Sequence, residues 1–157
     1  MLNRVVWPLR ISTAKTYKLN SMSDSIHGVT IETVSGVTIF KVRGALKLGE
    51  SVLDELRGRC CELATRSIER LVLDLEHVPA IDSSGIGVLM QAYTSLHSRG
   101  GHCKLLNPAR TPCEVLRVVG LLRVFEVYHD RNAVLASFEG SPQQTKTGFA
   151  GGPERAA

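Results

Sequence analysis

The chain changes from a strand pattern to a helix pattern within residues 71–93, "LVLDLEHVPAIDSSGIGVLMQAY". The largely apolar run at residues 70–78 is typical of a strand that is buried on both faces. After a short polar turn, apolar residues recur at helical spacing between about Ser84 and Ser98, namely Ile86, Leu89, Tyr93 and Leu96. A buried strand that leads directly into a helix indicates a sheet with helices packed on it, and this constrains the fold most strongly.

The residues before this stretch predict a hairpin and a helix. Strands at Val29–Val34 and Val37–Val42 flank Ser35-Gly36, a two-residue pattern typical of a tight turn. An amphipathic helix follows, which Gly58 weakens but does not break. Its apolar face consists of Val52, Leu53, Leu56, Cys60 and Leu63.

The residues after it continue the alternation of strand and helix. Gly100-Gly101 can supply left-handed backbone and so end the helix, Pro108 can start the next helix, and Asp130 can cap the last one. The expected elements are a strand at 102–107, a helix at 109–121, a strand at 124–130 and a helix at 130–138. The order β-β-α-β-α-β-α-β-α predicts an α/β fold with a mixed, mostly parallel sheet and flanking helices.

A chain of 157 residues is long enough for one domain whose core needs neither disulfides nor metal. We expect a folded domain at 25–139, between a basic, disordered or artefactual leader at 1–24 and a disordered tail at 140–157. A transit peptide and a translation start at Met22 are the alternatives for the leader.

The basic excess of the chain lies in the leader. Residues 1–21 contain no acid and four of the 19 Lys and Arg residues, so the other 15 balance the 15 Asp and Glu residues. We therefore expect no nucleic-acid-binding face on the folded domain. No apolar run approaches the roughly 18 residues that a membrane span needs, so no membrane insertion is predicted.

The four cysteines, Cys60, Cys61, Cys103 and Cys113, include no Cys-x-x-Cys pair. Such a pair would indicate zinc binding or redox chemistry, and adjacent Cys60 and Cys61 point to different sides of a helix. Ordinary reduced thiols are typical of the cytoplasm. The sequence thus predicts a cytoplasmic protein without a metal or another cofactor.

The polar turn at residues 82–87 is the candidate functional site, because functional loops of such sheets lie at the carboxyl ends of strands. Asp82 or Ser83 can cap the helix by accepting from its first N–H groups. Gly85 and Gly87 lower helix propensity, which favours a first turn whose face is open to a partner's backbone. A capped turn beneath a packed helix is the purely structural alternative.

Catalytic readings of this turn have little support. No lysine follows the glycines, as a phosphate-binding loop requires, and Ser83 lies outside a Gly-x-Ser-x-Gly nucleophile motif. None of the five histidines (His27, His77, His97, His102 and His129) is brought to Ser83 by the sequence. Covalent modification fits better, because a phosphate at a helix N-terminus meets the positive end of the helix dipole and adds charge where a partner docks.

Residues 71–93 strongly resemble the core of the STAS domain family, which includes bacterial anti-sigma factor antagonists and cytoplasmic domains of sulfate transporters. The similarity continues through "GGHCKLLNPARTPCEVLRVVGLLRVFEVYHDRNAVLASF" and includes "VTIFKVRGALKLGESVLDELR" upstream, so it covers roughly residues 27–138. It implies a small α/β module without catalytic activity. The characteristic element is aspartate-serine-(serine/threonine)-glycine-(isoleucine/leucine)-glycine after an "LDL" strand.

In antagonists of this family the serine after the aspartate is phosphorylated by the partner, an anti-sigma factor that is a serine kinase. The resemblance places that serine at Ser83, supported by Asp82, Ser84, Gly85 and Gly87. The unmodified antagonist binds the kinase and frees a sigma factor, phosphorylation releases the antagonist, and a phosphatase resets it. The alternative that the family offers is a STAS subunit of a lipid-transport ATPase complex.

This sequence departs from the family at the loop after the second strand. Many members have Gly-Glu-Leu-Asp there, whereas this chain has Gly44-Ala45-Leu46-Lys47. Lys47 and Leu48 are therefore a candidate partner-contact loop with an altered choice of partner, or Lys47 is a cation that can approach a phosphorylated serine. A solvated loop lysine is the structural alternative.

Overall fold

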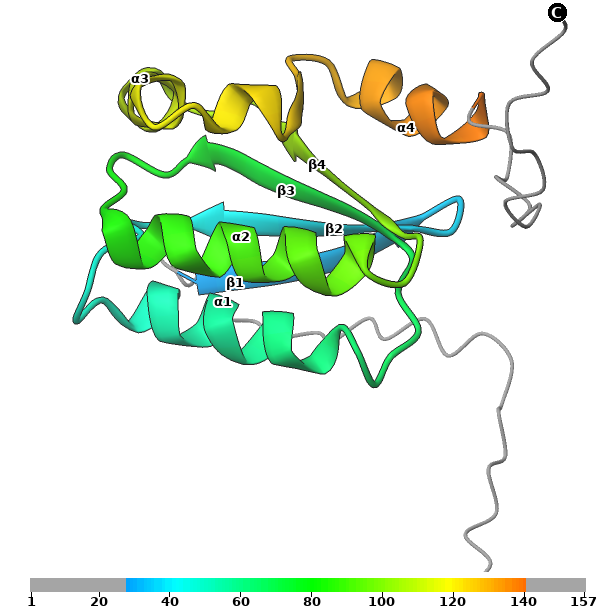
Figure 1. The fold of residues 1–157 in the computed structure, drawn as a ribbon, viewed down its shortest axis with the longest axis horizontal. Helices are drawn as coiled ribbons and strands as arrows, with labels where there is room; N and C mark the ends of the chain where they lie inside the picture. Colours follow the sequence, from blue (N-terminus) through cyan, green and yellow to red (C-terminus); the bar gives the residue numbers. More distant parts are fainter. Residues whose placement is uncertain (1–27, 141–157) are drawn as a thin grey trace, which may run out of the picture.

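The computed structural model describes residues 28–140, which form a single five-stranded sheet with helices on both faces (Figure 1). The strands lie side by side in sequence order. β1 and β2 are antiparallel, while β2, β3, β4 and β5 are parallel to one another. The strands are β1 (Gly28–Val34), β2 (Val37–Arg43), β3 (Arg70–His77), β4 (His102–Leu106) and β5 (Glu126–Tyr128). The predicted α/β class and mixed, mostly parallel sheet are confirmed.

Within residues 28–140, four α-helices and one 3-10 helix connect the strands or follow them. α1 and α2 lie next to each other on one side of the sheet, and α4 lies on the opposite side (Figure 1). Their bounds are α1 (Ser51–Glu62), α2 (Ser83–His97), α3 (Arg110–Val118), η1 (Leu121–Arg123) and α4 (Arg131–Glu139).

β3 is buried on both faces, as its apolar run predicts. Its Leu71, Leu73 and Leu75 point into the larger core cluster, beneath α1 and α2. Val72 points the other way, into a smaller cluster with Val134 and Phe138 of α4. The strand that leads to the candidate site is therefore held from both sides, which makes its carboxyl end a rigid platform.

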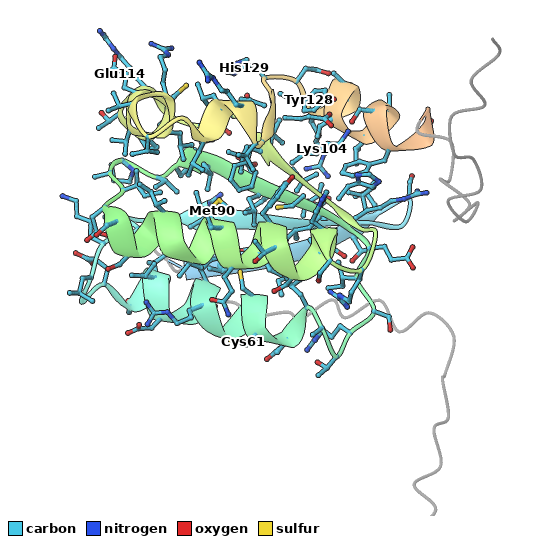
Figure 2. The ribbon with its side chains drawn as sticks, viewed as in Figure 1. Cys61, Met90, Lys104, Glu114, Tyr128 and His129 are labelled. Atoms are coloured by element: carbon cyan, nitrogen blue, oxygen red, sulfur yellow. The ribbon has the colours of Figure 1, made fainter. Side chains whose placement is uncertain are left out.

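A buried lysine lies beside the smaller cluster. Lys104 of β4 is 4% exposed, and its ammonium group lies 2.9 Å from Glu126 Oε2 and 2.9 Å from Ser137 Oγ. It also lies over the rings of Tyr128 and Phe138, at 5.2 and 4.6 Å from the ring centroids. Figure 2 shows Lys104 close to Tyr128 on the α4 side of the sheet. The ammonium thus has polar and aromatic neighbours that compensate for its loss of water.

The hairpin and the helix caps follow the sequence closely. Ser35 and Gly36 both adopt positive φ angles, 51° and 77°, as a tight two-residue turn between right-twisted strands requires. Asp130 caps α4 by accepting from the Ala133 N–H at 2.7 Å. Gly100, with φ 78°, supplies the left-handed residue after α2, whereas Gly101 does not.

Three predictions in the last third of the chain are wrong in extent. Pro108 does not start α3, which begins at Arg110, because Asn107 with φ 47° and the extended Ala109 still turn the chain there. The helix ends at Val118, because Gly120 adopts a left-handed φ of 78° before η1. The strand expected at 124–130 pairs only at Glu126–Tyr128.

The buried face of α2 also differs from the predicted stripe. Leu89 and Leu96 are buried, but Ile86 and Tyr93 are only partly so. The other buried residues of α2 are Gly85, Val88 and Ala92.

The expectations for the leader and for the tail beyond Gly140 lie outside the described residues. Within residues 28–140, no helix combines the length and apolar character needed to cross a membrane.

Candidate functional site

α2 begins at Ser83, immediately after the extended N-cap residue Asp82. The Asp82 Oδ1 atom accepts the N–H groups of Ser84 and Gly85 at 2.8 and 3.1 Å. These are two of the N–H groups that have no partner within the helix. Of the two cap residues that the sequence offered, the structure therefore uses Asp82, which leaves the Ser83 side chain uncommitted.

The loop between β2 and α1 is bound to this turn. Leu46 forms an isolated parallel bridge with Ile81: its N–H donates to the Ala80 carbonyl at 2.9 Å, and its carbonyl accepts the Asp82 N–H at 3.1 Å. Two residues further, the Leu48 N–H donates to Asp82 Oδ2 at 2.9 Å. The turn after β3 and the loop after β2 are thus one hydrogen-bonded unit.

The electrostatics of the unit depend on Asp82. The Leu48 N–H is the largest of several influences that hold the pKa of the Asp82 carboxyl below its ordinary value. The Gly85 N–H and, more weakly, the Ser84 N–H and the positive charge of Lys47 act in the same direction, against an opposing effect of desolvation. Asp82 is therefore ionised at neutral pH, and both of its carboxylate oxygens already accept hydrogen bonds.

The two serines of the motif differ in their surroundings. Ser83 is exposed, and its hydroxyl forms no hydrogen bond with any described residue. Ser84 is partly buried and contributes its backbone N–H to the Asp82 cap. Ser84 thus supports the turn through its backbone. The structure brings Ser83 to the surface as a free hydroxyl on a fixed helix start.

The two glycines of the motif also have different roles. A Cβ atom on Gly85 would overlap the Leu46 carbonyl oxygen and would lie 2.7 Å from Ile81 Cγ1. Gly85 therefore admits the chain's own β2–α1 loop, which corrects the expectation that it is open to a partner. A Cβ atom on Gly87 would meet no atom within 4 Å, so that position is open to the outside.

The candidate contact loop projects next to the turn. Leu48 is 76% exposed although its N–H is bound to Asp82, and Lys47 is exposed as well. A single exposed apolar side chain is common on protein surfaces, so the contact role of Leu48 stays a prediction from the sequence. The sequence singled out Lys47 and Leu48 but missed Leu46, because its two hydrogen bonds join residues 34 or more positions apart and leave no local pattern.

The other reactive side chains do not converge on Ser83. Within residues 28–140 all four histidines are exposed, and no group of three or more His, Cys, Asp or Glu residues is placed to hold a metal ion. Cys60 is buried, and burial raises the pKa of its thiol to about 12. Cys61 lies on the outer side of α1 (Figure 2), so the prediction that the two cysteines point to different sides of the helix is confirmed. All four thiols are free.

A mixed sheet with an N-capped helix after its central strand, tied to the loop of the neighbouring strand, defines a class of small α/β modules. A family profile of the STAS domain matches residues 28–133. The chain belongs to the STAS domain family.

Individual relatives agree with this assignment. The anti-sigma F factor antagonist of Paenibacillus polymyxa is 26% identical over 112 residues, which are 71% of this chain and 94% of that protein. The crystal structure of an anti-sigma factor antagonist from Mycobacterium paratuberculosis has a TM-score of 0.63 at 21% identity, over 71% of this chain and 92% of that chain. The structure of the Bacillus cell fate determinant SpoIIAA in its phosphorylated form has a TM-score of 0.57 at 20% identity. The match covers 70% of this chain and 99% of that chain. At these identities the solved structures establish the fold.

Proposed function

We propose that this protein is an anti-sigma factor antagonist that is switched by phosphorylation of Ser83. The unmodified protein binds an anti-sigma factor kinase in the cytoplasm and so frees a sigma factor, and phosphorylation releases it. The observation that carries this proposal is the exposed Ser83 hydroxyl, which forms no hydrogen bond within the described chain although the residues around it are fixed. The similarity to the Paenibacillus antagonist supplies the class of partner.

The phosphoryl transfer is the work of the kinase. The Ser83 Oγ atom attacks the γ-phosphorus of ATP, a new Oγ–P bond forms, the bond to the leaving ADP oxygen breaks, and the hydroxyl proton passes to a base of the kinase. Asp82 is a weak base for that proton, because backbone hydrogen bonds to both carboxylate oxygens hold its pKa below its ordinary value. A phosphatase reverses the change by transferring the phosphoryl group to water. The antagonist itself is a substrate and a binding module.

The geometry supports an effect of a single phosphate on binding. Ser83 lies beside the loop of Lys47 and the exposed Leu48, and the open position of Gly87 is one helical turn further. A partner that covers Leu48 and approaches Gly87 must also cover Ser83. Phosphorylation adds nearly two negative charges at the centre of that contact, close to ionised Asp82. Desolvating these charges opposes binding.

The proposal is tested by titrating the purified anti-sigma factor kinase of the source organism with unmodified and with phosphorylated antagonist. We expect tight binding of the unmodified form and of Ser83→Ala, and a loss of at least tenfold in affinity for the phosphorylated form. Ser83→Asp should weaken binding less, because one carboxylate carries less charge than a phosphate. Equal affinity of both forms would refute the switch. Association with an ATPase and a permease in place of a kinase would favour the lipid-transport subunit.

A further inference from the structure

We propose that Lys47 is the counter-cation of a phosphate on Ser83, so that phosphorylation fastens the loop at residues 45–49 to the start of α2. The inference deepens the proposed function and rests on it for the identity of the modified residue. It concerns what the chain does with the phosphate once the phosphate is there.

The backbone donors at the start of α2 are largely committed already. The Ser84 and Gly85 N–H groups donate to the Asp82 carboxylate, and the Ile86 N–H donates to the Asp82 carbonyl. A phosphate on Ser83 would thus find few free donors in the first turn and would lie beside the negative charge of Asp82. A cation from another part of the chain would offset this repulsion.

Lys47 is placed to supply that cation. Its two neighbours in the loop, Leu46 and Leu48, are hydrogen-bonded to Ala80 and Asp82, so its backbone is held next to the turn. Its ammonium group acts electrostatically on the Asp82 carboxyl, the residue before Ser83. Lys47 has no ion pair with any described residue, and Glu50, the nearest acid in its own loop, has none either. The side chain is therefore available.

The chemistry matches the position. A lysine ammonium is a compact charge on a flexible stem, and it can reach a phosphate that extends from Ser83 without a change in the backbone. A charge-assisted N–H···O bond between the two would add a second connection between loop and helix, besides the bond from Leu48 to Asp82. Lys47 is thus a positioning residue for the phosphate, and the phosphorylated state is more ordered at this loop than the unmodified one.

The test places phosphoserine at position 83 during translation, so that neither a kinase nor a partner is needed. The thermal midpoint is measured with serine and with phosphoserine in the parent, in Lys47→Gln, in Lys47→Arg and in Arg66→Gln. Arg66 is an exposed control between α1 and β3, at the end of the parallel strands opposite to Lys47. The shift caused by the phosphate should be more positive by about 3 °C in the parent than in Lys47→Gln.

In Lys47→Arg and in Arg66→Gln, the phosphate should shift the thermal midpoint by as much as it does in the parent. High salt should reduce the gap between the parent and Lys47→Gln. Hydrogen exchange at the Leu48 N–H should slow on phosphorylation only where position 47 carries a positive charge. Equal midpoint shifts on phosphorylation in the parent and in Lys47→Gln would overturn the inference. It would also be overturned if Arg66→Gln reduced the shift as much as Lys47→Gln does. Because phosphoserine is incorporated during translation, a negative result here does not bear on the switch by a kinase. If the switch itself is refuted, this experiment still tests the contact between Lys47 and the phosphate.

Discussion

The backbone carbonyl of Leu46 occupies the space that a side chain on Gly85 would need. This contact lets the β2–α1 loop lie against the first turn of α2, where Leu46 also accepts the Asp82 N–H. We expect Gly85→Ala to destabilise the fold by about 2 kcal/mol or more, because backbone has to move to admit the methyl group. Urea unfolding measures this change.

Gly87→Ala is the matched control in the same helix. Its new methyl group meets no atom within 4 Å, so the higher helix propensity of alanine should stabilise the protein by up to about 1 kcal/mol. Similar effects of the two substitutions would contradict the assigned contact between Leu46 and Gly85.

Asp82→Asn tests the double acceptor role of the Asp82 carboxylate. An asparagine has one acceptor oxygen, so it can keep the helix cap or the bond from Leu48, but not both. The variant should be less stable than the parent at pH 7, and the Leu48 N–H or the Gly85 N–H should exchange faster. Native-state hydrogen exchange identifies the bond that is lost.

The difference in stability between the parent and Asp82→Asn should depend on pH. Folding lowers the pKa of the Asp82 carboxyl below its ordinary 3.8, so its contribution to stability is complete above that value. The contribution is lost as the pH falls through the lowered pKa. The difference in stability between the parent and Asp82→Asn should therefore shrink below pH 3.8, and a constant difference at all pH values would argue against an ionised cap.

Leu48 should matter for partner binding and not for folding. Its side chain is 76% exposed, so Leu48→Ser should change the free energy of unfolding by no more than about 0.5 kcal/mol. Its affinity for the anti-sigma factor should fall by roughly tenfold, because the partner loses an apolar contact beside Ser83. Val118→Ser, which removes a side chain 87% exposed at the end of α3, is the control and should bind normally in the same calorimetric titration.

Lys104 tests whether a buried charge or its volume holds α4 on the sheet. Lys104→Met keeps the stem and its contacts with Tyr128 and Phe138, and should change stability by less than about 1.5 kcal/mol. Lys104→Ala leaves a cavity and should cost about 2–4 kcal/mol. Denaturant unfolding of both variants decides the matter, and an equal cost would show that the ammonium itself is required.

Features set by neighbouring residues could be predicted from the sequence. The hairpin at Ser35-Gly36, the apolar strand β3, the start of α2 near Ser83 and the Asp130 cap all depend on a few adjacent side chains. The extent of β5 could not be predicted in this way. The apolar pattern at 124–130 predicts a strand of seven residues, but only Glu126–Tyr128 pair with β4. Pairing at a sheet edge depends on the neighbouring strand as well as on local pattern.

The sequence names the residues of the candidate site but does not predict the contacts between them. Local sequence indicates a capped turn at Asp82 and Ser83. It contains no signal for the bond between Leu48 and Asp82, which are 34 residues apart, or for the fit of Leu46 against Gly85. These tertiary contacts explain why Gly85 is there and why Lys47 lies near the exposed serine.

The central claim is that the Ser83 hydroxyl is the acceptor of the switch. The most direct measurement is phosphopeptide mapping after the parent, Ser83→Ala and Ser84→Ala have been incubated with the anti-sigma factor kinase and ATP. The account predicts one phosphate on Ser83 in the parent and in Ser84→Ala, and none in Ser83→Ala, although that variant keeps the Asp82 cap and still binds the kinase. Phosphate on Ser84 in the parent, or full incorporation into Ser83→Ala, would contradict it.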